Sequence, residues 1–89
     1  MHTRSARAMD VRRRVGLNVK NFRKERELSQ EGLAFDCGLH RTYVSGVERG
    51  VRNPTVVVLE KIAEALKIPS SRLLEEPSRK QKSTKTRSY

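Results

Sequence analysis

The apolar residues of this chain recur at helical spacings. A first stripe repeats at intervals of four, four and three residues, which is one face of a helix. It consists of Val11, Val15, Val19 and Phe22. Asp10 can cap this helix, which we expect to run to about Glu27. Gly16 within it weakens the helix by up to about 1 kcal/mol relative to Ala, so tertiary packing must supply the rest.

Residues 28 to 50 predict two short helices joined by a tight turn. Ser29 can cap the first helix, at about 30–37, and Gly38 follows where a left-handed stop is needed. The second helix is expected from about Arg41 to Arg49, with Gly50 as its terminator. Each helix is only about two turns long, so neither is stable alone and both must pack on other elements.

Two further helices are expected after an Asn-Pro turn. Thr55 can cap the first of them, although the run TVVVL has the β-branched residues of a strand. The apolar positions repeat at i, i+3, i+4 and i+7, which decides for a helix. They are Leu59, Ile62, Ala63 and Leu66. Ser70 or Ser71 can cap a last short helix, whose Leu73 and Leu74 would close the core. The fold class is therefore all-α, with five helices.

The pair at 30–49 has the pattern of a helix-turn-helix. Ala34 is small where two helices must cross closely, and Gly38 permits a positive φ at the turn. The wedge between the helices would be filled by Leu39, Val44 and Val47. Four residues are left to face outward: Arg41, Thr42, Ser45 and Gly46. In this geometry the second helix lies in the DNA major groove and the first crosses the backbone.

Several stretches, in order and spacing, resemble the Cro and phage-repressor class of helix-turn-helix proteins, often called XRE-like. They are FRKERELSQEGLA, CGLHRTYVSGVERG, RNPTVVVLEKIAEALKIP and RLLEE. The resemblance covers roughly Val15 to Glu76. It implies a five-helix, lambda-repressor-like DNA-binding domain over residues 10–76, and double-stranded DNA as the partner.

Base readout is expected from the start of the second helix, which points deepest into the groove. Arg41 is the best candidate, because its guanidinium can bond bidentately to a guanine. Thr42 and Ser45 could contact base edges, a thymine methyl group or a water. His40 stands where a capping Ser or Thr is common and could reach a phosphate or a base edge. Gly46 stands where the resembled proteins often present a base-reading side chain, so readout of one base pair is in doubt, or the backbone approaches more closely.

Phosphate contacts are expected from residues that flank the groove. The helix that begins at Gln30 offers free N–H groups and a side-chain amide to an anion. The full set is Ser29, Gln30, Tyr43, Arg49, Arg52 and Asn53. For Arg49 and Arg52 the alternative is an ordinary solvated face.

The resemblance also implies an ion pair within the scaffold. A basic residue at the Arg23 position of the first helix would pair with an acid at the Glu48 position, near the end of the recognition helix. Such a charge-assisted bond would place the recognition helix rather than contact bases. The alternative is that both are surface charges.

The 89 residues carry a net charge of +10, which is concentrated near the two ends. Residues 1–14 contribute +4 and residues 77–89 contribute +5, whereas residues 15–76 contribute only +1. We expect a flexible basic arm at 1–9 and a disordered basic tail at 77–89. Such ends favour a polyanionic partner, or they are simply solvated.

The composition argues against other functions. A domain this small buries only about 60% of its unfolded surface, so an enzymatic pocket is not expected. The sequence shows no nucleophile with a base, no Gly-rich phosphate loop and no cofactor or small-molecule site. Cys37, His2 and His40 lack metal-ligand spacing, and Cys37 reads as a small buried hydrophobe. No membrane segment or signal peptide is evident, so we expect a cytoplasmic, nucleoid-associated protein.

The function predicted from these features is a sequence-specific DNA-binding transcriptional regulator. One domain covers only a half-site, so we expect a homodimer. The resemblance implies an interface on the last two helices, around Leu66 to Leu74, formed by the exposed apolar residues of that segment. It could be an autoregulator or a restriction–modification controller. Two alternatives are a bridging module that uses the fold to hold other proteins, and a non-specific nucleic-acid binder driven by the basic tails.

Overall fold

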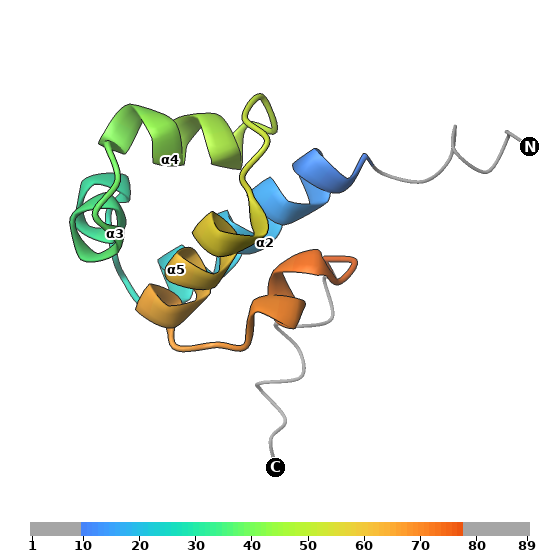
Figure 1. The fold of residues 1–89 in the computed structure, drawn as a ribbon. Coiled ribbons are helices and arrows are strands. Elements are labelled where there is room, and N and C mark those ends of the chain that lie inside the picture. Colours follow the sequence, from blue (N-terminus) through green and yellow to red (C-terminus); the bar gives the residue numbers. More distant parts are fainter. Residues whose placement is uncertain (1–9, 78–89) are drawn as a thin grey trace, which may run out of the picture.

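The computed structural model describes residues 10–77, which form four α-helices and one 3-10 helix, with no strand in that range (Figure 1). They are α2 Val11–Glu25, α3 Gln30–Cys37, α4 Arg41–Glu48, α5 Val56–Leu66 and η1 Ser70–Leu74. The all-helical class is confirmed, but the fifth α-helix is wrong. The predicted arm at 1–9 and the predicted tail beyond Pro77 lie outside the described residues.

The last element is a 3-10 helix, as its i to i+3 backbone hydrogen bond shows. It has five residues and follows Pro69, whose carbonyl oxygen accepts a bond from the Arg72 N–H at 3.0 Å. Such i to i+3 bonding is common in short pieces. Within the described range, no side chain caps its start, so the cap predicted at Ser70 or Ser71 is also wrong.

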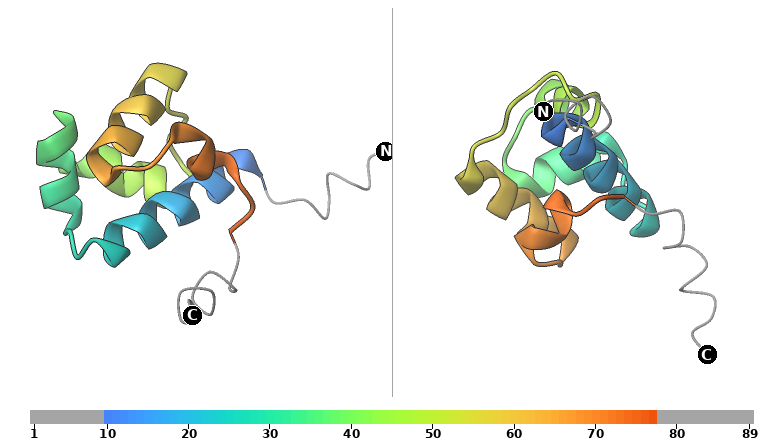
Figure 2. Two further views of the ribbon diagram at one scale, coloured as in Figure 1. Left: turned by 90° about the horizontal axis from the view of Figure 1, so that it is seen from below. Right: turned by 90° about the vertical axis from the view of Figure 1, so that its right-hand side faces the viewer.

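One hydrophobic core joins all five elements. Helix α2 packs on α4, α5 and η1, α3 packs on α4 and α5, and η1 lies against α2 and α5 (Figure 2). The buried hydrophobic residues of the described chain are Val15, Val19, Phe22, Leu33, Ala34, Cys37, Val44, Val47, Leu59, Ile62, Ala63, Leu66 and Leu73. The apolar stripes therefore meet as predicted, with two exceptions.

Val11 and Leu74 were expected in the core but are 46% and 45% exposed. Val11 is the first residue of α2, one turn before the buried part begins at Val15. Leu74 ends η1, and neighbouring residues of a helix point in different directions, so only Leu73 turns inward.

Three predicted N-caps are confirmed. The side chain of Asp10 accepts a bond from Arg12 N, that of Ser29 from Gly32 N and that of Thr55 from Val58 N, at 2.8, 2.9 and 3.1 Å. The stop at Gly38 is left-handed, with φ 73°. Helix α2 ends two residues earlier than predicted because Glu27 takes φ 56°, and Leu28 N then bonds back to the Arg23 carbonyl at 3.0 Å.

Helices α2 and α4 cross at Gly16. A Cβ added there would lie 2.6 Å from the Glu48 carbonyl oxygen and closer still to that of Val47. Only glycine allows this approach, so Gly16 offsets its low helix propensity by letting α4 pack directly on α2. Packed on α2 in this way, α4 lies at one edge of the molecule, and η1 lies at the opposite edge (Figure 1).

Polar contacts hold η1 against α2. The Asn18 amide nitrogen donates to the carbonyl oxygens of Leu73 and Glu75, at 2.8 and 2.7 Å. The Arg14 Nε donates to the carbonyl oxygen of Leu74 at 2.8 Å. These side chains satisfy backbone carbonyls that a 3-10 helix leaves free at its end.

Candidate nucleic-acid interface

Helix α4 presents a polar face above a buried apolar one. Arg41 and Thr42 are exposed and Ser45 is half-buried, whereas Val44 and Val47 are almost fully buried. His40 is exposed at the N-cap, and within the described residues its side chain makes no capping hydrogen bond. The first turn of α4 therefore keeps N–H groups free for an external acceptor such as water or an anion. Three of the predicted base-reading residues stand together at this end.

Gly46 was expected to face outward, but here it is buried under another side chain, and its role in base readout stays a prediction. The side chain of Arg52 lies over it. A Cβ at residue 46 would be 2.5 Å from Arg52 Cγ, which is too close for two carbon atoms. The guanidinium carbon of Arg52 in turn lies 5.6 Å from the centroid of the Tyr43 ring, within range of a cation–π contact. The sequence did not indicate this arrangement.

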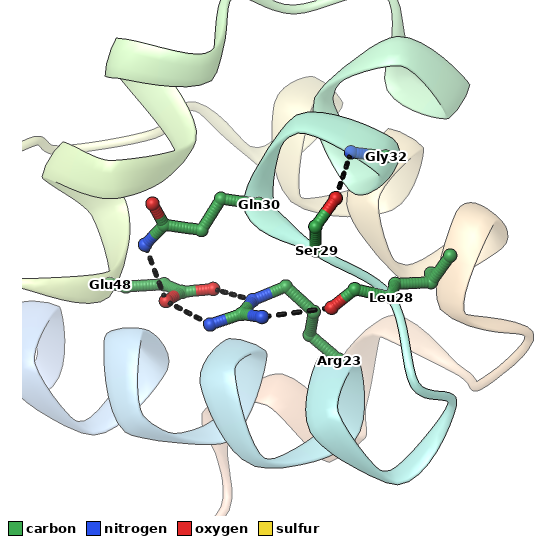
Figure 3. A network of polar contacts seen from close by, with 6 residues as sticks. All are labelled: Arg23, Leu28, Ser29, Gln30, Gly32 and Glu48. Atoms are coloured by element: carbon green, nitrogen blue, oxygen red, sulfur yellow. Dashed lines mark hydrogen bonds and ion pairs between the residues drawn. The ribbon is translucent and has the colours of Figure 1, made fainter.

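A buried ion pair joins the end of α4 to α2 (Figure 3). Arg23 Nε lies 2.6 Å from Glu48 Oε2, and Arg23 Nη2 donates to Glu48 Oε1 at 3.0 Å. Only 10% of the Arg23 side chain and 4% of the Glu48 side chain are exposed. The hydrogen bonds to Glu48 raise the pKa of the Arg23 guanidinium further, so it stays charged. This is the pair that the resemblance implied, in bidentate form.

The same network includes α3 and the loop before it. Arg23 Nη1 donates to the Leu28 carbonyl oxygen at 2.8 Å, and the Gln30 amide donates to Glu48 Oε1 at 3.0 Å (Figure 3). Gln30 was expected only as a phosphate contact, and its bond to Glu48 was missed. A carboxamide has two N–H donors, so one remains for another acceptor. Glu48 thus links the three helices α2, α3 and α4.

Comparison with known proteins supports the same assignment of the fold. Residues 19–73 match the family described as Helix-turn-helix. The chain belongs to this helix-turn-helix family. The matched range includes α3 and α4, together with the Arg23 and Glu48 that brace them.

Three similar proteins illustrate the relationship. The control protein C.BamHI of Bacillus amyloliquefaciens is 43% identical over 67 residues, which cover 74% of this chain and 83% of that protein. The restriction-modification controller protein C.AhdI of Aeromonas hydrophila is 45% identical, with a TM-score of 0.68 over 70% of this chain and 94% of that one. The hypothetical transcription factor NHTF of Neisseria is 42% identical, with a TM-score of 0.75 over 86% and 85% of the two chains.

The remaining predicted phosphate contacts flank α4 in this helix-turn-helix. Arg49 is exposed at the C-cap of α4, and Arg52 and Asn53 are exposed in the loop that follows. Tyr43 is half-buried on α4 itself, and Ser29 is exposed at the start of α3. The hydroxyl of Ser29 accepts the Gly32 N–H but can still donate its own proton. Together with His40 and Arg41 at the start of α4, these residues place cationic and polar groups at both ends of the helix.

The described residues offer little for other chemistry. Across residues 10–77, no group of three or more His, Cys, Asp or Glu side chains is placed to hold a metal ion. Cys37 is buried as predicted, and its burial raises the pKa of the thiol to about 11. A thiol held protonated in this way is a poor nucleophile. None of the helices in this range is long and apolar enough to cross a membrane.

Proposed function

We propose that this protein is a DNA-binding transcriptional regulator that places α4 in the major groove. The observation that carries the proposal is the exposed start of α4, with Arg41 and Thr42, held on the scaffold by the buried pair of Arg23 and Glu48. A fixed helix is needed because base readout depends on side-chain position. Its relatives named as control proteins favour a controller of a restriction–modification system, acting in the cytoplasm on the chromosome.

In this function the residues that read bases and the residues that bind phosphates form two separate sets. Arg41 would bond to a guanine, and Thr42, Ser45 and His40 would contact neighbouring base edges. Phosphates on either side would be bound by Ser29, Gln30, Tyr43, Arg49, Arg52 and Asn53. We omit Gly46 from the base-reading set because Arg52 covers it.

We propose a homodimer that uses the last two helical elements, as expected, but with its contact centred on the start of α5 and not on the segment from Leu66 to Leu74. Leu66 and Leu73 are fully buried in the core, so they are not available to a second copy. Val56 and Val57, in the first turn of α5, are 77% and 66% exposed. Two adjacent exposed valines are a better candidate for a self-complementary contact. Reading two half-sites would then supply the discrimination that one domain lacks.

Footprinting on the DNA upstream of its own coding sequence, with excess competitor DNA at physiological salt, tests the function. We expect a protected two-part site, with centres about one helical turn apart. Uniform protection would instead support non-specific binding through the basic ends. If neither that DNA nor genomic fragments are retained, the bridging module becomes the better reading.

Arg41→Ala tests the assignment of base readout. Loss of a bidentate guanine contact should cost about 1–3 kcal/mol of binding and relax specificity at one position. Arg49→Ala is the matched control, because loss of a phosphate contact should weaken all sequences similarly. Binding by both variants is measured against an operator and its single-base variants. Equal losses on every sequence for Arg41→Ala would contradict its role.

A further inference from the structure

Gly46 and Arg52 form an arrangement that the proposed function does not yet explain. The loop from α4 to α5 starts at the C-terminal end of α4 (Figure 1). Its backbone is fixed there, because Val51 N and Arg52 N both donate to the Gly46 carbonyl oxygen, at 3.0 and 3.2 Å. Gly50 takes φ 78° to allow this return of the chain.

The side chain of Arg52 is fixed at two further points. Its stem lies against the bare Cα of Gly46, where a Cβ would be 2.5 Å from Cγ, 3.3 Å from Nε and 3.5 Å from Cδ. Its guanidinium lies over the ring of Tyr43, which precedes Gly46 by three residues on α4. The side chain therefore runs back along α4 toward its N-terminal half instead of extending freely into solvent.

We propose that Gly46 is a positioning residue for DNA binding: it leaves a slot on α4 in which Arg52 lies, so that its guanidinium is held ready for the nucleic acid. The inference rests on the proposed placement of α4 in the major groove. An arginine has a large rotamer entropy to lose on binding, and a side chain already held in place loses less of it. A loop residue thus supplies the charged group that residue 46 itself lacks.

Comparing Gly16 with Gly46 makes the proposal testable, because a Cβ added at each position would meet different neighbours. At Gly16 a Cβ would meet backbone carbonyls, which cannot move without separating the helices. At Gly46 it would meet only a flexible side chain, which can swing away. Gly46→Ala should therefore fold normally, with Arg52 displaced from its slot.

The experiment is a double-mutant cycle of Gly46→Ala and Arg52→Ala, read as DNA affinity over a range of salt concentrations. We expect each single variant to bind about tenfold more weakly, with a salt slope lower by about one. The double variant should also lose about tenfold, not about a hundredfold, because both changes remove the same contact. The matched control is Gly46→Ala with Arg49→Ala, whose effects should multiply.

A second measurement uses the free protein and is independent of DNA. Proton chemical shifts of the Arg52 side chain should show the ring current of Tyr43, and Gly46→Ala should abolish that effect. Unchanged affinity of Gly46→Ala, multiplying losses in the Arg52 cycle, or an unshifted Arg52 in the wild type would each overturn the proposal. Failure of the proposed function is distinguishable, because the wild type and Arg41→Ala would then bind every DNA alike.

Discussion

At the scale of single residues, the polar groups that matter are those with partners fixed by the fold. Glu48 has three: two nitrogens of Arg23 and the amide of Gln30. Burying a carboxylate without such partners would lower the stability of the fold. Removing one member of an existing buried pair also lowers stability strongly, because the other charge is left buried without its counter-charge. The ion pair therefore fixes the position of α4 relative to α2. Its contribution to stability is best measured by removing one partner.

Replacing Glu48 by alanine should reduce the free energy of unfolding by about 3–5 kcal/mol, because Arg23 would remain buried and unpaired. DNA affinity should fall as well, since α4 loses its anchor. Urea denaturation and DNA titration measure the two effects. Glu64→Ala, which removes an exposed carboxylate of α5, is the control and should change stability by no more than about 0.5 kcal/mol. Unchanged stability and affinity in Glu48→Ala would sink this account.

The cap of α2 gives a pH-dependent effect. Hydrogen bonds from the side chain and backbone of Arg12 lower the pKa of Asp10 from 3.8 to about 2. A carboxyl with a lower pKa in the folded state stabilises it above pH 4, and the effect is lost as pH falls toward 2. The stability difference between the wild type and Asp10→Asn, which keeps a capping oxygen, should therefore shrink over that range. A difference independent of pH in thermal unfolding would contradict this.

At the scale of elements, the recognition helix depends on how closely α2 and α4 approach. Helix α4 has only eight residues, too few for independent stability. It is held by the close crossing at Gly16, by the ion pair at its end and by Val44 and Val47 beneath it. A helix so short keeps its orientation only while all these contacts persist.

Gly16→Ala should destabilise the protein, although alanine is the better helix former. The gain in propensity is about 1 kcal/mol, but the added Cβ would force α2 and α4 apart, and overpacking of this kind typically costs about 1–3 kcal/mol or more. We expect a net loss in urea denaturation together with weaker DNA binding. Gly46→Ala is the comparison, with stability equal to the wild type or higher. Equal behaviour of the two variants would refute this distinction.

At the scale of the whole molecule, charge and exposed apolar surface are distributed differently. Most of the net charge of +10 comes from residues 1–14 and 77–89, while residues 15–76 are close to neutral. Exposed valines stand at the start of α5. Long-range attraction to DNA would therefore depend on the ends of the chain. Association with a second copy would instead depend on α5.

Charge substitutions at the start of α5 test the dimer. Val56→Glu with Val57→Glu should give a monomer at concentrations where the wild type is a dimer, as measured by analytical ultracentrifugation. Acidic residues suit the first turn of a helix, so the fold should survive. Leu74→Glu, the comparison on η1, should remain a dimer. The opposite result would return the interface to the segment from Leu66 to Leu74.

The sequence by itself determined the four α-helices, three of their N-caps and the helix-turn-helix. Apolar spacing and capping are local properties, and residues such as Ser29, Gly38 and Thr55 act within a few positions along the chain. The pairing of Arg23 with Glu48 was available only through the resemblance, because their separation of 25 positions leaves no local signal.

Only the tertiary structure decided which residues face one another. It placed Gly16 at the crossing of α2 and α4 and the side chain of Arg52 over Gly46. It also paired Gln30 with Glu48 through a hydrogen bond. It made the last element a 3-10 helix and left Val56 and Val57 exposed at the start of α5. Each of these depends on how segments far apart in the chain, or a loop and the helix before it, pack in space. Hydrophobic periodicity says which face of a helix turns inward but not what it meets there.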